Sequence, residues 1–260
     1  MYKGSNIAVV MPAYNAAKTL QTAFDEVVAQ GIADTVIIVD DCSTDATEQI
    51  ARELVQSADN HGDKISPPLQ VIYHRHERNR GYGGNQKSCY DLALKNGADI
   101  IVMVHPDCQY TPKLLTAMAS MIREGLHPCV LASRILGGYA LKGGMPLWKY
   151  LNNRWLTATM NLLLGSKLSE FHTGYRAFSA DLIRKLPLER NTDDFAFDAQ
   201  MLAEILWTGA TIGEVSCPTV YTTEASSINF TRSCKYGFGC LGTSLAFRLA
   251  KFGLRLGVFH

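Results

Sequence analysis

The stretch Ile100-Ile-Val-Met-Val-His-Pro-Asp-Cys-Gln-Tyr-Thr-Pro112 indicates how this chain is organised. Its apolar first part, residues 100–104, is typical of a short strand that is buried on both faces. His105, Asp107 and Gln109 follow on alternate residues, and alternate residues of an extended segment point to the same side. Three side chains able to bind a cation are therefore predicted to face one spot at the end of a strand.

A helix should follow this polar loop. Thr111 and Pro112 are a helix N-cap and a first-turn proline in sequence, and Gly125 is a natural stop. A strand, a polar loop and a helix in this order are typical of the place where an open α/β sheet binds its ligands. An ordinary turn in which Asp107 caps the next helix explains the same residues equally well.

Three more apolar runs precede this stretch, and a helical pattern follows each of them. The runs cover residues 7–11, 36–39 and 69–73. The helices are expected at 18–30, after Ser43 as the N-cap, and from the glycine-rich turn 79–87 to residues 96–97, with a polar loop at 58–68. Four strands that alternate with helices predict a parallel, doubly wound sheet.

The second half is expected to contribute further strands and helices. These are a strand at 130–134, a helix at 147–164 closed by Gly165, a helix at 195–207 and an edge strand at 211–221. The apolar but Arg- and Lys-interrupted segment 236–259 is explained by an amphipathic helix lying on a membrane or by a last helix packed on the domain. No run reaches the roughly 18 uninterrupted apolar residues of a spanning helix, and residues 1–6 lead us to expect no signal peptide.

Composition excludes some classes of protein. The 260 residues carry a net charge of +1, which gives no electrostatic basis for binding nucleic acid. A hydrophobic share of 47% and a charged share of 19% are those of a globular protein with a real core. The seven cysteines include no C-x-x-C pair, so we expect neither a zinc site nor a disulfide framework, and a reducing, cytoplasmic setting fits best.

Polar side chains follow the first two predicted strands as well. Tyr14-Asn15 follows one, and the carboxylate pair Asp40-Asp41 follows the other. Such carboxylates suit the ring nitrogens of a base or the hydroxyls of a ribose. The turn Gly81-Tyr-Gly83 lacks the G-x-G-x-x-G spacing, and the chain has no G-x-x-x-x-G-K-[ST] phosphate loop. Nucleotide binding is therefore predicted without either common glycine motif at these strand ends.

Taken in order, these motifs resemble the family 2 glycosyltransferases, and most of all the dolichyl- or polyprenyl-phosphate sugar synthase branch. The matching segments are Pro12-Ala-Tyr-Asn15, Asp40-Asp41-Cys-Ser43, Asn79-Arg-Gly81, His105-Pro-Asp107-x-Gln109 and His172-Thr-Gly-Tyr-Arg-Ala-Phe178. The resemblance implies a GT-A (Rossmann-like) three-layer sandwich with a mostly parallel central sheet. It implies one catalytic domain at 1–235, with a nucleotide-binding half at 1–110, an acceptor-binding half at 111–235, and a C-terminal amphipathic helical segment at 236–260.

The resemblance also implies roles for residues. Nucleotide contacts are expected from Pro12, Ala13, Tyr14, Asn15, Asp40, Asp41, Ser43, Gly81, Asn85, Lys87 and Asp107. A divalent cation, Mn²⁺ or Mg²⁺, would be held by His105, Asp107 and Gln109. Phosphate or acceptor contacts are expected from Arg134, Lys149, Thr173 and Arg176. Thr192-Asp-Asp194 resembles the family's T-E-D segment, so Asp194 is the first candidate for the base and Asp198 the second, with a helix N-cap as the alternative for either.

One departure from the family pattern concerns the metal. His105 stands where the family has the first Asp of D-x-D-x-Q. A neutral imidazole still binds Mn²⁺ but suits Mg²⁺ less well than a carboxylate does. Metal affinity should therefore be lower, and it should depend on pH below about 6.5.

The expected function is inverting transfer of a sugar from a nucleoside diphosphate sugar, with UDP as the first choice and GDP as the second. The expected acceptor is polyprenyl phosphate or another lipid-linked molecule, reached from the cytoplasm at the inner face of the membrane. A soluble or hydroxyl acceptor is the alternative, as is a non-catalytic nucleotide-sugar-binding module, which the altered D-x-D would explain.

Overall fold

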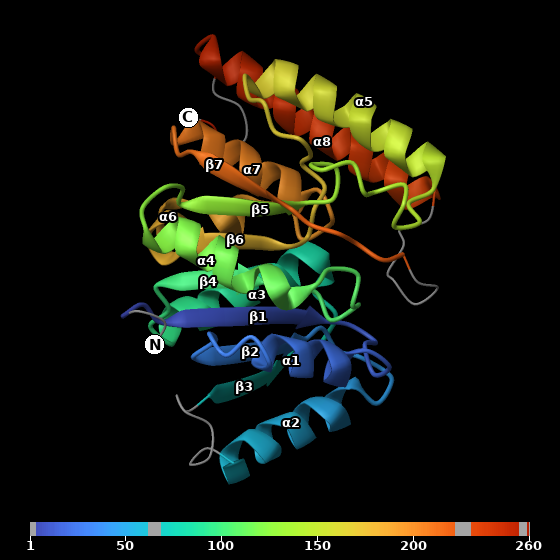
Figure 1. The fold of residues 1–260 in the computed structure, drawn as a ribbon. Coiled ribbons are helices and arrows are strands. Elements are labelled where there is room, and N and C mark those ends of the chain that lie inside the picture. The colour runs from blue at the N-terminus through green and yellow to red at the C-terminus, as the bar shows by residue number, and fades with distance from the viewer. Residues whose placement is uncertain (1–3, 62–68, 222–229, 255–258, 260) are drawn as a thin grey trace.

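A seven-stranded sheet with helices on both faces forms the protein (Figure 1). The computed structural model describes residues 4–61, 69–221, 230–254 and 259. Its strands are β1 Ile7–Ala13, β2 Thr35–Asp40, β3 Gln70–Arg75, β4 Ile100–Met103, β5 Cys129–Ser133, β6 Arg176–Ser179 and β7 Ile212–Ser216. Its α-helices are α1 Leu20–Val28, α2 Thr47–His61, α3 Gly81–Lys95, α4 Leu115–Arg123, α5 Leu147–Leu164, α6 Ala180–Lys185, α7 Phe197–Trp207 and α8 Phe230–Lys251, with short 3₁₀ helices at Pro112–Leu114 and Leu188–Arg190.

The sheet is mostly parallel, as predicted. Its strand order is β3-β2-β1-β4-β6-β5-β7. β1 pairs in parallel with β2 and β4, and β5 pairs in parallel with β7, whereas β6 is antiparallel to both of its neighbours, β4 and β5. Because β6 runs backwards, its first residues lie at the edge where β4 and β5 end.

Two apolar cores fill the space between the sheet and the helix layers. Along β1, Ile7, Val9 and Met11 face a core with α1, α2 and α4, while Ala8 and Val10 face a core with α3, α5, α7 and α8. Every residue of β1 is buried, because a parallel strand in this position is covered on both faces. This arrangement confirms the predicted three-layer α/β sandwich.

The largest difference from the sequence prediction is β6, since residues 172–178 were expected only as a motif and not as part of the sheet. Smaller differences concern the ends of elements. α2 continues through His61 into the predicted loop 58–68, of which residues 62–68 lie outside the described residues. α8 begins at Phe230, earlier than the expected start at residue 236, and the predicted edge strand 211–221 is shorter but does lie at the sheet edge.

α5 and α8 lie side by side beyond β7 and α7, at the opposite end of the molecule from α2 (Figure 1). α5 ends as predicted at Gly165, which has a left-handed φ of 70°. Trp207 of α7 packs against Phe247 of α8 with ring centroids 5.4 Å apart. Within the described residues, no helix is both long enough and apolar enough to cross a bilayer.

Candidate functional site

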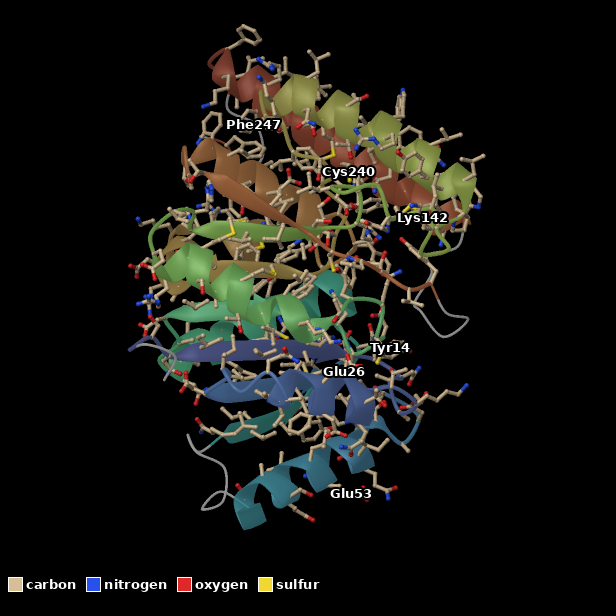
Figure 2. All side chains as sticks on the ribbon, in the orientation of Figure 1. Tyr14, Glu26, Glu53, Lys142, Cys240 and Phe247 are labelled. Carbon is tan, nitrogen blue, oxygen red and sulfur yellow. The ribbon has the colours of Figure 1, made fainter. Side chains whose placement is uncertain are left out.

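The loops that carry the predicted nucleotide contacts meet at one edge of the sheet, where β1, β2 and β4 end. Figure 2 shows Tyr14 and Lys142 on this side of the molecule. Asn15 has a left-handed φ of 51°, its amide donates to Ser43 Oγ at 2.8 Å, and its side chain accepts from the amide of Thr44 at 2.9 Å. The loop after β1 is thus joined to the loop after β2, which gives this edge a defined shape.

Ser43 does not cap a helix as predicted. The hydroxyl of Ser43 accepts a hydrogen bond from the amide of Asn15. The amide of Thr47, at the start of α2, donates instead to the side chain of Asp45. Pro12 and Ala13 belong to β1 and are buried, so their side chains are not available to a nucleotide, whereas Tyr14 is 55% exposed.

Asp40 and Asp41 are buried, and their carboxylates accept hydrogen bonds from other groups of the protein. Asp40 accepts the amide of Ser43 at 2.9 Å and the hydroxyl of Tyr73 at 3.1 Å. Asp41 accepts the amides of Arg80 and Gly81 at 2.7 and 2.9 Å, and it lies 2.7 Å from His76 Nδ1. In this conformation the two carboxylates hold the loops at the ends of β2 and β3 together, and the direct nucleotide contacts predicted for them stay predictions.

The glycine-rich start of α3 packs tightly against the loop at 191–193. Gly81 has a φ of 84°, and a Cβ there would lie 2.7 Å from the carbonyl oxygen of Asp193, so a larger residue does not fit. Lys87 is buried and donates to the Asn191 carbonyl at 2.6 Å and to Asp193 Oδ1 at 2.7 Å. Asn85 is also buried and donates to the Val39 carbonyl at 3.1 Å. In this conformation both side chains donate to groups inside the protein, and the nucleotide contacts predicted for Asn85 and Lys87 stay predictions.

His105 is packed between Tyr82 and Gly174. Its ring stacks on that of Tyr82 with centroids 5.6 Å apart, and Nε2 lies 3.3 Å from the Tyr82 hydroxyl. A Cβ on Gly174 would lie 2.7 Å from His105 Cδ2, so only glycine leaves room for the ring. Burial lowers the pKa of His105, although Asp107 acts in the opposite direction, and the ring is neutral at physiological pH.

The reasoning that placed His105, Asp107 and Gln109 on one side of an extended segment is wrong. The segment turns, and Cys108 has a left-handed φ of 54°, so alternate residues do not share a face. Asp107 Oδ1 accepts the amide of Gln109 at 3.1 Å, and Gln109 lines a cavity. No group of three or more His, Cys, Asp and Glu side chains suited to a metal occurs among the described residues.

Arg176 and Asp198 form a buried ion pair. Arg176 is fully buried, and its Nη1 lies 3.2 Å from Asp198 Oδ1. Asp198 also accepts from the Tyr82 hydroxyl at 2.9 Å and from Gln86 at 3.0 Å. The guanidinium of Arg176 is enclosed by protein in this conformation, and Asp198 is its counter-ion. The phosphate contact predicted for Arg176 and the role of base predicted for Asp198 stay predictions.

Thr173 and Asp194, the remaining acceptor-side candidates, differ in exposure. Thr173 is fully buried and donates to the Ala132 carbonyl at 2.7 Å, and its predicted acceptor contact stays a prediction. The side chain of Asp194 is 39% exposed, accepts the amide of Phe195 at 2.8 Å and lies 2.5 Å from Lys235 of α8. Of the two carboxylates predicted as bases, Asp194 is the accessible one.

Arg134 stands at the wall of a cavity of about 460 Å³, which we call the acceptor-side cavity. Glu170 holds Arg134 through Nη2 and Oε2, 2.7 Å apart, and Tyr221 accepts from Nη1 at 3.2 Å. Burial alone would lower the pKa of Arg134, but the Glu170 carboxylate raises it well above its usual value. Lys149 lines the same cavity, and both burial and Arg134 lower its pKa. Two cations therefore lie close together here, and only one has a carboxylate partner among the described residues.

The walls of the acceptor-side cavity are mostly apolar and aromatic. They come from α5, α8 and the loops at the end of β4 and before β6, and Gln109 joins the cavity to the loop of Asp107. His172 lines it as well, and its Nδ1 lies 2.6 Å from the hydroxyl of Tyr236. The apolar and aromatic lining residues are Met145, Trp148, Trp155, Leu156, Tyr221, Tyr236, Phe238 and Leu241.

The sequence matches the family model described as Glycosyl transferase family 2 over residues 8–187. The chain belongs to this family. A relative from Methanococcus voltae, the UDP-N-acetylglucosamine–dolichyl-phosphate N-acetylglucosaminyltransferase, is 30% identical over 218 residues, which are 83% of this chain and 86% of that protein. The polyprenol monophosphomannose synthase of Mycolicibacterium smegmatis is 22% identical over 216 residues, 82% of this chain and 76% of that protein.

A solved structure shares the fold. It is glucosyl-3-phosphoglycerate synthase from Mycobacterium tuberculosis in complex with Mn²⁺, UDP and glucosyl-3-phosphoglycerate, with a TM-score of 0.65 at 19% identity, covering 94% of this chain and 80% of that chain. The predicted family and the GT-A fold are thus confirmed, and this family 2 glycosyltransferase is similar in sequence to the polyprenyl-phosphate sugar synthases.

Sequence reasoning missed several residues of the acceptor side. Glu170, Tyr82 and His172 were not singled out, although they hold Arg134, His105 and Tyr236 respectively. Glu170 did carry a signal, because it is the only acidic residue between Glu124 and Asp181. An isolated acid in a long stretch without others is a candidate partner for a buried cation.

Proposed function

We propose that this glycosyltransferase transfers a sugar with inversion from a nucleoside diphosphate sugar, UDP-sugar in first place, to the phosphate of a polyprenyl phosphate. One observation carries the proposal. The acceptor-side cavity combines two neighbouring cations, Arg134 and Lys149, with apolar walls, and through Gln109 it adjoins the loop of Asp107. A ligand with an anionic head and an apolar tail fits this combination.

The cations support a phosphate in particular. The pKa of Lys149 is lowered by burial and by the charge of Arg134, so an anion between the two would relieve both effects. A guanidinium held by Glu170 keeps its orientation and presents fixed donors to phosphate oxygens. Trp148, Leu156 and Phe238 offer apolar surface to the tail.

The reaction then needs no protein base. An acceptor phosphate is ionised at neutral pH, so its oxygen attacks the anomeric carbon directly. The bond from this carbon to the nucleotide diphosphate breaks on the opposite side, which inverts the configuration. We assign to Asp194, whose carboxylate is partly exposed, the orientation of the sugar hydroxyls. Transfer to a hydroxyl would instead require Asp194 to accept a proton.

A divalent cation fits the loop at 105–109 only in part. Asp107 has one carboxylate oxygen without a hydrogen-bond partner among the described residues, and Gln109 offers an amide oxygen. His105 is in the neutral form that ligates metals, and an imidazole favours Mn²⁺ over Mg²⁺. When bound, the cation would neutralise charge on the leaving diphosphate. We therefore propose Asp107, Gln109 and His105 as its ligands, with Mn²⁺ as the better ion.

Calorimetry of UDP and GDP binding tests the donor side, with Mn²⁺, with Mg²⁺ and with EDTA. We expect UDP to bind most tightly with Mn²⁺ and to lose at least about tenfold in affinity in Asp107→Ala. Lys113→Ala, an exposed change in the same region, serves as the control. Binding of neither nucleotide would overturn the proposal, and binding indifferent to EDTA would remove the cation from it.

Transfer assays test the acceptor side, with polyprenyl phosphate and with the matching polyprenol. We expect product only from the phosphate, and we expect Lys149→Ala to raise the KM for polyprenyl phosphate at least about tenfold. Lys185→Ala is the matched control, because Lys185 is exposed in α6 and does not line the cavity. Transfer to the polyprenol would favour the hydroxyl alternative, and nucleotide binding without any transfer would favour a binding module.

A further inference from the structure

The outward side of α5 is apolar, although none of the described residues covers it. Trp148, Leu151, Trp155 and Leu162 are spaced by three, four and seven residues, which puts them on one side of the helix, and their exposed fractions are 46, 58, 62 and 75%. The residues that α5 buries lie on the opposite side and are Asn153, Leu156, Thr157, Met160 and Leu164. The water-facing side of a helix normally carries polar residues, so a continuous apolar stripe there indicates an interaction surface.

α8 repeats the pattern next to α5. Phe238 and Leu245 lie seven residues apart, with exposed fractions of 77 and 50%, and Phe252, also 77% exposed, follows the end of the helix. Cys240, Ser244 and Phe247 are buried on the other side. We call the exposed apolar residues of α5 and α8, together with Phe252, the outer face. Figure 1 shows the two helices side by side at one end of the molecule.

The segments that contain α5 and α8 are basic, whereas the rest of the chain is acidic. Residues 125–169 and 225–260 include both helices, and they contain ten of the 25 Lys and Arg residues but none of the 24 Asp and Glu residues. The remainder of the chain is consequently acidic, although the whole has a net charge of +1. Described cations of the helix pair include Arg154, Arg248 and Lys251, and Figure 2 shows Lys142 at the end of the pair.

The acceptor-side cavity opens on the outer face. Trp148 and Trp155 of α5 and Phe238 of α8 line the cavity and are also exposed. Tryptophan is enriched where a protein meets the headgroup region of a bilayer, because its ring is apolar and its N–H is polar. Apolar side chains, tryptophans and a basic surplus are together the features of a surface that binds anionic lipid. Of the ten cations, Arg134 pairs with Glu170 and Lys235 with Asp194, both outside the two segments.

We propose that the outer face lies on an anionic lipid bilayer. Its leucines, phenylalanines and tryptophans enter the headgroup and acyl boundary, and the cations of α5, α8 and the preceding loop contact lipid phosphates. The inference does not rest on the acceptor assigned above, because any anionic bilayer suffices. A second copy of the chain would cover apolar residues as well, but two equally basic surfaces would repel each other.

Sedimentation with vesicles tests the proposal. Vesicles of phosphatidylcholine alone are compared with an equal mixture of phosphatidylcholine and phosphatidylglycerol, neither containing polyprenyl phosphate. We expect binding to the mixed vesicles, weaker binding to phosphatidylcholine alone, and weaker binding as salt increases. Tryptophan emission should shift to shorter wavelength on the mixed vesicles.

Two variants locate the contact. Leu151→Glu/Leu162→Glu should lower the partition coefficient at least about tenfold, and Leu162→Glu alone should lower it less. Neither residue lines the cavity, so UDP binding and circular dichroism should stay unchanged. Leu126→Glu is the matched control, because Leu126 is 62% exposed outside the two helices, and it should bind vesicles like the wild type.

Three results would overturn the proposal. The first is equal binding to both kinds of vesicle, and the second is unchanged binding by Leu162→Glu, which is too exposed to disturb folding. The third is a stable dimer in ultracentrifugation that Leu151→Glu/Leu162→Glu dissociates, since it would assign the outer face to a second copy. Failure of polyprenyl phosphate transfer would not affect these outcomes.

Discussion

Arg134 and Glu170 form a buried ion pair at the wall of the acceptor-side cavity, with Nη2 and Oε2 2.7 Å apart. The carboxylate of Glu170 also accepts the backbone amide of Arg134 and the side chain of Asn153. Burial would raise the pKa of Glu170, but Arg134 lowers it below its usual value. One carboxylate thus fixes both the backbone and the guanidinium of Arg134, which supports the orientation needed to bind an anion.

Glu170→Gln should destabilise the protein by about 2–4 kcal/mol, because it leaves a buried guanidinium without its counter-charge. The free energy of unfolding in urea measures this. Glu124→Gln is the control, since Glu124 is exposed and pairs with Arg123, and its cost should be about 0–1 kcal/mol. Equal effects of the two changes would contradict a structural role for the Arg134–Glu170 pair.

Gly174→Ala should displace the His105 ring, because the new Cβ would lie 2.7 and 2.8 Å from His105 Cδ2 and Nε2. We expect a loss of about 1–3 kcal/mol in stability and weaker Mn²⁺-dependent UDP binding. Gly242→Ala in α8 is the matched control, because nothing lies within 4 Å of its Cβ position, and alanine there should be neutral or slightly stabilising. Unchanged UDP binding in Gly174→Ala would separate His105 from the donor site.

Asp198→Asn should mainly lower stability, whereas Asp194→Asn should mainly lower kcat. Asp198→Asn removes the charge that compensates buried Arg176, so it should cost about 3–5 kcal/mol in unfolding free energy. Asp194→Asn removes the charge from a partly exposed contact with Lys235 and should cost about 0–1 kcal/mol, while kcat falls about 10- to 100-fold. Urea unfolding and steady-state kinetics give the two quantities. A catalytic loss in Asp198→Asn without any loss of stability would reverse this assignment.

His172 should make stability depend on pH. Burial lowers its pKa to about 4, against about 6.5 in the unfolded chain. Between these values the unfolded state binds a proton that the folded state does not, so the free energy of unfolding falls as the pH falls from about 6.5 to about 4. The loss in unfolding free energy should be about 1–3 kcal/mol. We expect a value near the lower end of this range, because His172 is partly accessible to solvent. Above about pH 6.5 His172 has no effect of this kind.

Urea unfolding of the wild type and of His172→Gln at several pH values measures this contribution, and the slope in that window should be smaller in the variant. Nuclear magnetic resonance titration of the His172 ring gives its pKa directly. An ordinary pKa near about 6.5, or equal slopes in the two proteins, would show that the ring is not buried as described.

Local patterns predicted most of the helices and strands because each carries its own periodicity and stop signals. β1 and β4 read as continuous apolar runs, and α5 ends at Gly165 as the sequence indicates. β6 was not predicted, because only its position between β4 and β5 makes residues 176–179 a strand. A strand of four residues has too short a pattern to be recognised without its neighbours.

For the candidate site, too, the sequence predicted one part and the structure supplied the other. The sequence indicated which loops meet at the sheet edge, but it could not tell a ligand contact from an internal hydrogen bond. Asp41 and Lys87 are polar residues in the expected places, yet both are buried and satisfied by the protein. The prediction that His105, Asp107 and Gln109 share one face failed because it assumed an extended backbone, whereas Cys108 has a left-handed φ of 54°.

By itself the sequence determined the fold class, the family and the edge of the sheet where the motif-bearing loops meet, because these depend on periodicity and on motifs read in order. Only the tertiary structure decided which candidates are free to act. Arg134 lines a cavity, whereas Arg176 is fully buried. Several leucines and tryptophans of α5 are exposed. The reason is physical: burial and hydrogen bonding depend on which distant segments pack together, and local sequence does not record that.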